Sequence, residues 1–303
     1  MKVAVANEEK WSSLLPLRIA IQGELGSFSH EAALRMADAL DVERGGNGAT
    51  VIPCAISADV FRSMAREAAD AAVIPIENSL AGPVAEHYDL LLGEDVAIER
   101  EMLLRIRHNL IGLPGSQLEG IKRVFSHPVA LAQCRHFLDG HPAIRAVPFY
   151  DTAGSVKQVI ESGDPSSAAI ASGRAGEQYG GEILAAGIED NPANFTRFFL
   201  IRSTRRVPVD PMADKVSIAF TVENRPGTLV EALKVFAGQG TNLTKIESRP
   251  VQGRPWQYVF FVDYQLSTLF TADTIAGLLG SSCSMVKELG RYRSAVVEQD
   301  SPR

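Results

Sequence analysis

The sequence predicts an α/β protein followed by a smaller ferredoxin-like domain of the βαββαβ kind. Three observations carry this prediction. Strand and helix patterns alternate with short connections through most of the chain, which favours parallel sheets. One of these strands, Ala71–Ile76, is a continuous apolar run typical of a strand buried on both faces. After a polar, Pro-rich stretch at residues 205–214, apolar and polar residues alternate instead, which indicates half-buried strands and a second domain.

The first domain is predicted over residues 17–204. We expect a loop at residues 43–50, where glycine and asparagine are frequent. The long extended stretch Val96–Ile111 is of the kind that crosses between two lobes. Further strands are expected at Leu17–Ile21, Ile121–Phe125, Val147–Tyr150 and Ala168–Ala171 and from Thr196, and helices around Ala33–Leu40, from Asp59, over Gly82–Leu92 and Val129–Leu138, through Ile160 and after Ser172.

The second domain is predicted over residues 215–293, after a linker at residues 205–214. We expect the tail after Val297 to be disordered. The predicted elements are a strand at Val216–Val222, a turn at Asn224–Gly227, a helix with Leu229, Leu233 and Phe236 on one face, strands at Asn242–Ser248 and Trp256–Gln265, a helix at Thr271–Leu279 and a strand at Met285–Tyr292.

Composition and charge exclude several classes of function. The 303 residues carry a formal net charge of −6 without a basic stripe, so we expect neither nucleic acid nor a membrane as a partner. Three widely spaced cysteines without a Cys-x-x-Cys pair predict reduced thiols and no zinc site. Residues 1–16 lack the apolar core of a signal peptide and no stretch is long enough to span a membrane, so we expect a cytoplasmic protein.

Small polar residues follow several of the predicted strands, where these lead into helices. In parallel sheets such junctions meet at one edge, where ligands bind against helix N-termini. Each residue alone is most simply a helix cap. Together they predict a cleft lined by hydroxyl, amide and backbone N–H groups, which suits a small anion with carboxylates. The junction residues are Ser27, Ser29, Asn78, Ser79, Ser126, His127, Asp151, Thr152 and Ser172, joined by Thr196 and Arg197, where a loop enters the last strand.

Five motifs in the first domain, taken in order, resemble prephenate dehydratase. They are Gly23-x-x-Gly26-Ser27-Phe28-Ser29, Ile74-Pro75-Ile76-Glu77-Asn78-Ser79, Ser126-His127-Pro128-x-Ala130-Leu131-x-Gln133-Cys134, Asp151-Thr152-Ala153 and Thr196-Arg197-Phe198. The C-terminal unit resembles the regulatory ACT domain attached to that enzyme, through Glu223-Asn224-Arg225-Pro226-Gly227-Thr228-Leu229 and Ile246-Glu247-Ser248-Arg249-Pro250. The resemblance covers residues 18–292, and the ordered set of motifs is specific.

The resemblance implies a fold, a reaction and a set of site residues. The first domain is expected to have two α/β lobes hinged around a cleft, as in type II periplasmic binding proteins. The implied reaction converts prephenate to phenylpyruvate, water and carbon dioxide without a metal or cofactor. Phenylalanine bound between ACT domains of a homodimer or homotetramer is expected to inhibit it. By resemblance, Thr196 is catalytic; Ser27, Asn78, Ser79, Ser126, Gln133, Thr152, Arg197 and Phe198 bind substrate; and Asn224, Pro226, Gly227, Thr228, Leu229, Glu247, Ser248 and Arg249 bind the effector.

The role expected of Thr196 also follows from the chemistry of the substrate. Prephenate is a cyclohexadienol close to aromaticity, so the joint loss of its ring carboxylate and ring hydroxyl is strongly downhill. The site need only hold the dianion and help hydroxide leave. A threonine hydroxyl is too weak an acid to protonate a resting alcohol, but it can donate to the oxygen as the C–O bond breaks and charge develops. A dry environment around the ring carboxylate would favour decarboxylation.

Two positions depart from the pattern of the family. Ser27 stands where family members often have threonine, and the hydroxyl is kept. Thr228 replaces the alanine that is usual in the ACT turn, which predicts weaker phenylalanine binding or an altered selectivity.

Other functions stay open at this point. Arogenate dehydratase acts on a substrate with an amino group in place of the side-chain keto group, and no motif distinguishes the two enzymes. An amino-acid sensor would bind a ligand without turnover, but a pure binder has no need of a proton donor at Thr196. A protein that works only through its ACT interface would leave the polar junctions unexplained.

Overall fold

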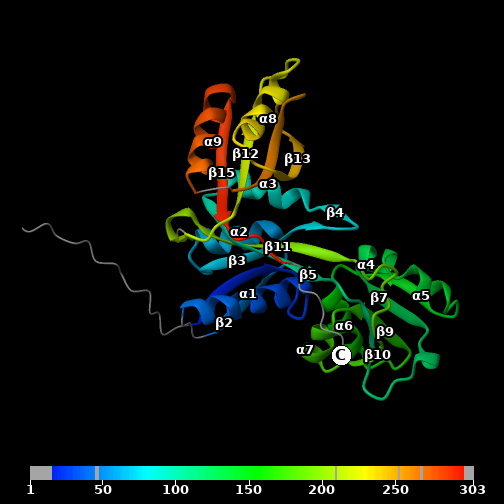
Figure 1. Cartoon of the computed structure of the whole chain (residues 1–303). Helices are drawn as coiled ribbons and strands as arrows, with labels where there is room; N and C mark the ends of the chain where they lie inside the picture. Colours follow the sequence, from blue (N-terminus) through cyan, green and yellow to red (C-terminus); the bar gives the residue numbers. More distant parts are fainter. Residues whose placement is uncertain (1–15, 45–47, 209, 252, 267–268, 297–303) are drawn as a thin grey trace, which may run out of the picture.

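The computed structural model describes residues 16–44, 48–208, 210–251, 253–266 and 269–296. The chain forms two lobes of a first domain and a C-terminal domain that lies against the first lobe (Figure 1). The expectations for residues 1–15 and for the tail after Val297 lie outside the described residues. Over the described ranges, none of the helices combines the length and the apolar character needed to cross a membrane.

The first lobe is a mixed sheet with helices on both faces. Its strands are β1 (Leu17–Gln22), β2 (Ala49–Cys54), β3 (Ala71–Asn78), β4 (Gly82–Pro83), β5 (Val96–Arg105) and β11 (Phe195–Ser203), and its helices are α1 (Phe28–Arg44), α2 (Ser57–Ala65) and α3 (Ala85–Gly93). The strand order is β2-β1-β3-β11-β5, with β4 paired to β3. Strands β1, β2 and β3 are parallel, whereas β11 returns antiparallel to both β3 and β5. The helix α1 packs on one face, and α2 and α3 pack on the other.

The second lobe is a smaller sheet of the same kind. Its strands are β6 (Asn109–Gly112), β7 (Arg123–Ser126), β8 (Arg145–Pro148), β9 (Ser167–Ala171) and β10 (Glu182–Ala185), and its helices are α4 (Pro128–Ala132), α5 (Arg135–Asp139), α6 (Thr152–Ser162) and α7 (Gly173–Tyr179). The order is β10-β6-β9-β7-β8, in which β7, β8 and β9 are parallel. The chain enters this lobe through β6 and returns to the first lobe through β11.

The C-terminal domain has the predicted βαββαβ order. It comprises β12 (Lys215–Thr221), α8 (Thr228–Gly238), β13 (Leu243–Pro250), β14 (Tyr258–Gln265), α9 (Leu269–Ser282) and β15 (Met285–Tyr292). Its antiparallel sheet has the order β13-β14-β12-β15, which leaves β13 at one edge. Both helices pack on one face of this sheet, and the other face lies on the first lobe.

Several elements of the first domain differ from the sequence prediction, and the helix expected over Gly82–Leu92 begins only at Ala85, after β4. Strand β2 follows the expected loop directly, and β10 was not predicted either. The predicted helix Val129–Leu138 is two short helices, which meet at Gln133 and Cys134. The sheets are mixed and not purely parallel, because β6 and β11 run against their neighbours. The stretch Val96–Ile111 does cross between the lobes, as β5 in one sheet and β6 in the other.

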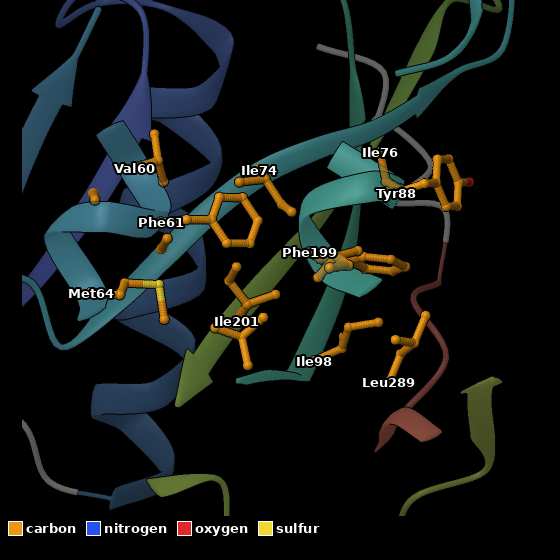
Figure 2. Close-up of a cluster of buried hydrophobic side chains, with 14 of the residues drawn as sticks. Val60, Phe61, Met64, Ile74, Ile76, Tyr88, Ile98, Phe199, Ile201 and Leu289 are labelled. Atoms are coloured by element: carbon orange, nitrogen blue, oxygen red, sulfur yellow. The ribbon is translucent and has the colours of Figure 1, made fainter. Parts of the chain in front are cut away.

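The first lobe and the C-terminal domain share a hydrophobic core. Figure 2 shows Phe61 of α2, Ile74 of β3, Ile98 of β5 and Phe199 of β11 gathered with Leu289 of β15. All five side chains are buried, and each such side chain stabilises the fold by about 1.5–3 kcal/mol. The strands approach closely here, since a side chain at residue 290 would collide with the backbone of Ile98. Docking of the C-terminal domain is therefore part of the packing of the whole chain.

Candidate active site

A cavity of about 780 Å³ lies between the two lobes, where β3 ends and β11 begins. A cavity of this size accommodates a small organic molecule. Six of the residues predicted to act on or bind the substrate line it: Ser27, Asn78, Gln133, Thr152, Thr196 and Phe198. The other three, Ser79, Ser126 and Arg197, do not.

Thr196 and Asn78 form a hydrogen-bonded pair in the cavity wall. They are cross-strand partners on β11 and β3, and Asn78 Nδ2 donates to Thr196 Oγ1 at 2.9 Å. The side-chain oxygen of Asn78 accepts from the backbone N–H groups of Leu80 and Ala81 at 3.0 and 2.8 Å, which defines the orientation of the amide. Thr196 Oγ1 is therefore an acceptor toward Asn78, and its own O–H is free to donate to a ligand.

A β-bulge turns Asn78 toward the cavity. The pairing of β3 with β11 shifts by one residue between Arg197 and Phe198, so Ile76 is an extra residue on β3. Side chains alternate between the two faces along a regular strand, and Ile76 lies on the face away from the cavity. Without the extra residue Asn78 would share that face. The bulge places the side chain of Asn78 on the cavity face of the sheet, with its amide opposite Thr196.

The hydrogen bonds continue from Asn78 to the second lobe. Asn78 Nδ2 also donates to Asn194 Oδ1 at 2.7 Å, and Asn194 Nδ2 donates to Gln133 Oε1 at 3.0 Å. The same Gln133 oxygen lies 3.0 Å from His108 Nε2, so that nitrogen carries a proton. Burial lowers the pKa of His108, against the effects of Gln133 and Glu189, which favours a neutral ring. The side-chain NH₂ of Gln133 is left to face a ligand.

Asn194 and His108 are site residues that the sequence analysis missed. Asn194 is fully buried, and His108 lines the cavity beside Phe28, at a ring distance of 5.6 Å. A signal for Asn194 was present, because residues 194, 196 and 198 have the spacing of one strand face. His108 lies in the extended stretch Val96–Ile111, where a histidine is more often structural than catalytic.

The helix ends at the cavity differ in what they offer a ligand. At α1, Ser27 caps the helix through the backbone N–H of His30 at 3.3 Å, and Ser27, Phe28 and Ser29 line the cavity. The first N–H groups of a helix have no partners within it, so this end favours an anion. At α6, the carboxylate of Asp151 already accepts from the backbone N–H of Gly154 at 2.7 Å. The end of α1 is thus the better place for a substrate carboxylate.

The structure contradicts the expectation that Arg197 binds substrate. Thr196 and Phe198 face the cavity, so the side chain between them faces the opposite side of the sheet. There the Arg197 guanidinium donates to Glu101 at 2.7 Å and to Asp263 at 2.5 Å. Its charge is used between the domains and not in the cavity.

Ser126 and Ser79 are also held outside the cavity. Ser126 is fully buried and donates to the carbonyl of Ile170 at 2.6 Å, inside the second-lobe sheet. Ser79 donates to the carbonyl of Ala193 at 3.1 Å and accepts from the N–H of Phe195 at 3.0 Å. Ser79 contacts backbone next to Thr196, and neither serine contacts the cavity itself.

The two lobes touch along one side of the cavity. Ser172 of the second lobe donates to the carbonyl of Gly26 at 2.6 Å, and Tyr150 donates to Glu24 at 2.9 Å. Gly26 has a φ of +88°, and a Cβ there would lie 2.8 Å from the Cα of Ala175. Only glycine satisfies both conditions, which explains its place in the loop before α1.

The charged side chains of the cavity lining are carboxylates. Glu24 and Asp151 line it, and no lysine or arginine does so among the described residues. Burial raises the pKa of Asp151, in spite of the N–H bond from Gly154. An anionic ligand must therefore rely on helix ends, hydroxyls and amides. Over the described ranges, no cluster of three or more His, Cys, Asp or Glu side chains is arranged to hold a metal ion.

Comparisons with known proteins agree with this architecture. The family model for prephenate dehydratase matches residues 19–206, and the model for the ACT domain matches residues 216–263. The chain belongs to the prephenate dehydratase family. A relative from Arabidopsis thaliana, the chloroplastic arogenate dehydratase/prephenate dehydratase 2, is 38% identical over 269 residues, which cover 86% of this chain and 67% of the relative.

Two solved structures are similar to this member of the prephenate dehydratase family over nearly its whole length. Prephenate dehydratase from Arthrobacter aurescens, in complex with L-Phe, superposes with a TM-score of 0.80 at 34% identity and covers 92% of this chain and 90% of its own. GqqA, described as a novel type of quorum quenching acylase, superposes with a TM-score of 0.81 at 32% identity and covers 93% of this chain and 100% of its own.

The first group of predicted effector residues lies at the start of α8 in the ACT domain. Gly227 has a φ of +89° and precedes the helix, and Thr228 donates to the carbonyls of Glu223 and Arg225 at 2.6 and 2.9 Å. The hydroxyl of Thr228 is thus used within the turn. The side chain of Leu229 packs against the ACT core.

The second group lies on the edge strand β13, where side chains alternate between two faces. Arg249 faces the first lobe and forms an ion pair with Asp89 of α3 at 2.7 Å. Ser248 is exposed on the other face of the strand. The assignment of Ser248 and Arg249 to the effector site stays a prediction, with the two side chains on opposite faces of β13.

Proposed function

We propose that the cavity converts prephenate to phenylpyruvate, water and carbon dioxide, with the Thr196 hydroxyl donating to the ring oxygen as it leaves. The observation that carries this proposal is the hydrogen bond from Asn78 to Thr196 Oγ1, because it leaves the O–H of Thr196 available to the substrate. A donor aimed at developing negative charge stabilises the transition state more than the bound substrate.

The other lining residues suit the parts of the substrate. The end of α1 with Ser27 and Ser29 is the proposed site of one carboxylate, and Thr152 and the Gln133 NH₂ are the proposed donors to the rest. Phe198 is buried beside Thr196 and would pack against the ring. Apolar packing at the ring carboxylate favours the neutral product, carbon dioxide.

Thr196 variants test this function directly. Thr196→Ala is expected to lower kcat for phenylpyruvate formation by about 10²-fold, the typical effect of removing one such donor, with a much smaller change in KM. Thr196→Ser keeps the hydroxyl and is the matched control, for which we expect most of the turnover to remain. Prephenate turnover that is unchanged in Thr196→Ala would remove this residue from the mechanism.

A second candidate substrate is arogenate, which the charges of the cavity favour. The described lining contains Glu24 and Asp151 but no lysine or arginine. The side-chain ammonium group of arogenate would be attracted by these carboxylates, whereas the keto group of prephenate would gain nothing from them. The relative from Arabidopsis thaliana is named for both substrates.

An acylase activity like that named for GqqA is less well supported. Acyl transfer needs a nucleophile hydrogen-bonded to a base. Among the described residues of the cavity lining, no serine, threonine or cysteine side chain is hydrogen-bonded to a histidine ring. Ser57 and His87 do form such a pair at 3.0 Å, but both are buried outside the lining.

We further propose inhibition by phenylalanine, a cytoplasmic location and a homodimer or homotetramer. Support for the effector comes from the ACT domain and from the similar structure in complex with L-Phe. Support for the assembly comes from the edge strand β13 and from Ile246 and Val230, which are exposed apolar residues of the same domain. Support for the location comes from the free thiols of Cys54, Cys134 and Cys283.

A further inference from the structure

A buried ionic network joins the ACT sheet to strand β11. Arg197 Nη1 lies 2.5 Å from Asp263 on β14, its Nε donates to Glu101 on β5 at 2.7 Å, and its Nη2 donates to Tyr292 on β15 at 3.0 Å. Ser217 on β12 donates to the other oxygen of Asp263 at 2.5 Å. Strands β14 and β15 of the ACT sheet thus contact Arg197, and β12 supports the contact through Ser217.

This network is closed to solvent and balanced in charge. The side chains of Arg197, Asp263 and Glu101 are 9%, 8% and 2% exposed. Lys215 pairs with Glu101 at 2.9 Å, so two cations face two carboxylates. Burial alone would lower the pKa of Arg197, but Tyr292, Asp263 and Glu101 raise it above its ordinary value. Removing one partner of a buried ion pair leaves the other charge uncompensated, so these contacts hold the domains in a defined position.

A second ion pair joins the ACT sheet to β3, the strand that pairs with β11. Lys245 on β13 lies 2.8 Å from Glu77 on β3, and its side chain is 12% exposed. Glu77 and Arg197 are cross-strand partners, and so are Asn78 and Thr196. The two cross-strand pairs are adjacent, because Glu77 precedes Asn78 and Arg197 follows Thr196. In the β3–β11 ladder, the rung formed by Asn78 and Thr196 therefore faces the cavity. The next rung, formed by Glu77 and Arg197, contacts the ACT sheet.

The two rungs cannot move independently. On each strand a single planar peptide joins the cavity residue to the residue that contacts the ACT domain. A misplacement of about 1 Å in a catalytic group can cost about 10²-fold in rate. A small shift of the ACT sheet would therefore reach Thr196 and Asn78 through the backbone.

We propose that Arg197 and Glu77 are positioning residues through which the ACT domain sets the geometry of Thr196 and Asn78. Phenylalanine bound to that domain then changes turnover by displacing these two ion pairs. The inference rests on the proposed function and assigns a path to its regulation, from β13 and β14 to the cavity wall. Such a path amounts to a coupling free energy between the two sites.

The same interface contains a contact that avoids this path. Lys287 on β15 donates to the backbone carbonyls of Leu91, Leu92 and Glu94 at 2.9, 2.9 and 2.7 Å, at the end of α3. None of the described residues of α3 lines the cavity. Lys287→Met therefore removes an interdomain contact and leaves the proposed path intact, which makes it the matched control.

The test compares the wild-type chain with Asp263→Asn, Lys245→Met and Lys287→Met. Calorimetry measures phenylalanine binding, prephenate turnover measures inhibition, and amide hydrogen exchange with and without phenylalanine follows peptides that contain residues 76–79 and 195–199. In the wild type and Lys287→Met, saturating phenylalanine is expected to lower kcat by about tenfold or more and to change exchange in both peptides. In Asp263→Asn and Lys245→Met, we expect phenylalanine still to bind but its effect on kcat to fall to about twofold, with little change in exchange.

Inhibition of equal size in all four proteins would overturn the inference, as would exchange changes in peptide 195–199 that survive Asp263→Asn. A wild-type chain that does not bind phenylalanine, or binds it without a change in either peptide, would also overturn it. If Asp263→Asn does not fold, Lys245→Met decides the question alone. The exchange measurement needs no turnover, so a chain inactive on prephenate would contradict the proposed function while the inference is still decided by exchange.

Discussion

At the scale of single residues, the direction of each hydrogen bond decides what the cavity can do. Asn78 uses its oxygen on the backbone N–H groups of Leu80 and Ala81, and its NH₂ group on Asn194 and Thr196. Turning the amide over would break all of these bonds, each with a net value of about 1 kcal/mol. Thr196 therefore faces a fixed donor, and its own proton is left for the substrate.

His87 is held in the same way behind the cavity wall. Its Nδ1 donates to the carbonyl of Pro75, and its Nε2 lies 3.0 Å from the hydroxyl of Ser57, which also lies 3.0 Å from Gln22 Oε1 and from Glu86 Oε2. Burial lowers the pKa of His87, against the effects of Pro75 and Glu86. Below its ordinary pKa of about 6.5 the unfolded chain binds a proton that the folded chain does not. Its contribution to stability is therefore complete above about pH 6.5 and is lost as the pH falls toward the folded-state pKa.

His87→Gln is expected to reduce the loss of stability on acidification. A single histidine of this kind contributes at most about 1.4 kcal/mol per pH unit to the free energy of unfolding. Urea unfolding of the wild type and His87→Gln at pH 7.5 and pH 5.5 measures the difference. The exposed His136 provides the control variant, His136→Gln, which measures the effect of replacing a histidine outside the core. An identical pH dependence in His87→Gln and the wild type would show that His87 is not the group that titrates.

At the scale of elements, strand β11 serves both domains because its side chains alternate. Thr196 and Phe198 face the cavity, whereas Arg197 and Phe199 face the ACT domain. Because of the bulge at Ile76, β3 is arranged in the same way, with Asn78 facing the cavity and Glu77 facing the ACT domain. One pair of strands thus carries the catalytic pair on one face and the regulatory contact on the other.

The sequence was sufficient to predict strand β11, but not which face of the sheet each of its side chains occupies. Its motif identified Thr196 correctly as a cavity residue, yet Arg197 was assigned to the same site although a strand places adjacent side chains on opposite faces. The bulge that turns Asn78 inward depends on pairing with a strand more than a hundred residues away, which no local pattern reports. Strand β2 was not predicted for a local reason, because Ala49–Cys54 is short and contains a proline.

The alternation along β13 predicts which of its residues senses phenylalanine. Ser248 is exposed on the face away from the first lobe, so Ser248→Ala is expected to weaken phenylalanine binding by about tenfold, the loss of one or two hydrogen bonds. Calorimetric titration of phenylalanine measures the effect. Ser281→Ala, which removes an exposed hydroxyl of α9, is the control. Equal affinity in Ser248→Ala and the control would place the effector elsewhere.

At the scale of the whole molecule, the three units are connected so that the cavity is sensitive to both of its neighbours. The second lobe closes on the first through Ser172 and Gly26, and the ACT domain shares the core of the first lobe through Phe199 and Leu289 (Figures 1 and 2). The βαββαβ order of the C-terminal domain was predicted from periodicity, and the two lobes and the ACT domain were predicted from the family motifs. The docking of the domains was not, because it depends on residues such as Asp263 and Tyr292 that carry no motif of their own.

The most direct test is turnover by the full chain, measured as phenylpyruvate formed from prephenate and, in parallel, as phenylalanine formed from arogenate, each with and without added phenylalanine. We expect prephenate to be converted, arogenate to be accepted as well because of Glu24 and Asp151, and both rates to fall when phenylalanine is present. Turnover of neither substrate, with phenylalanine still bound, would contradict the proposed enzyme and leave a sensor.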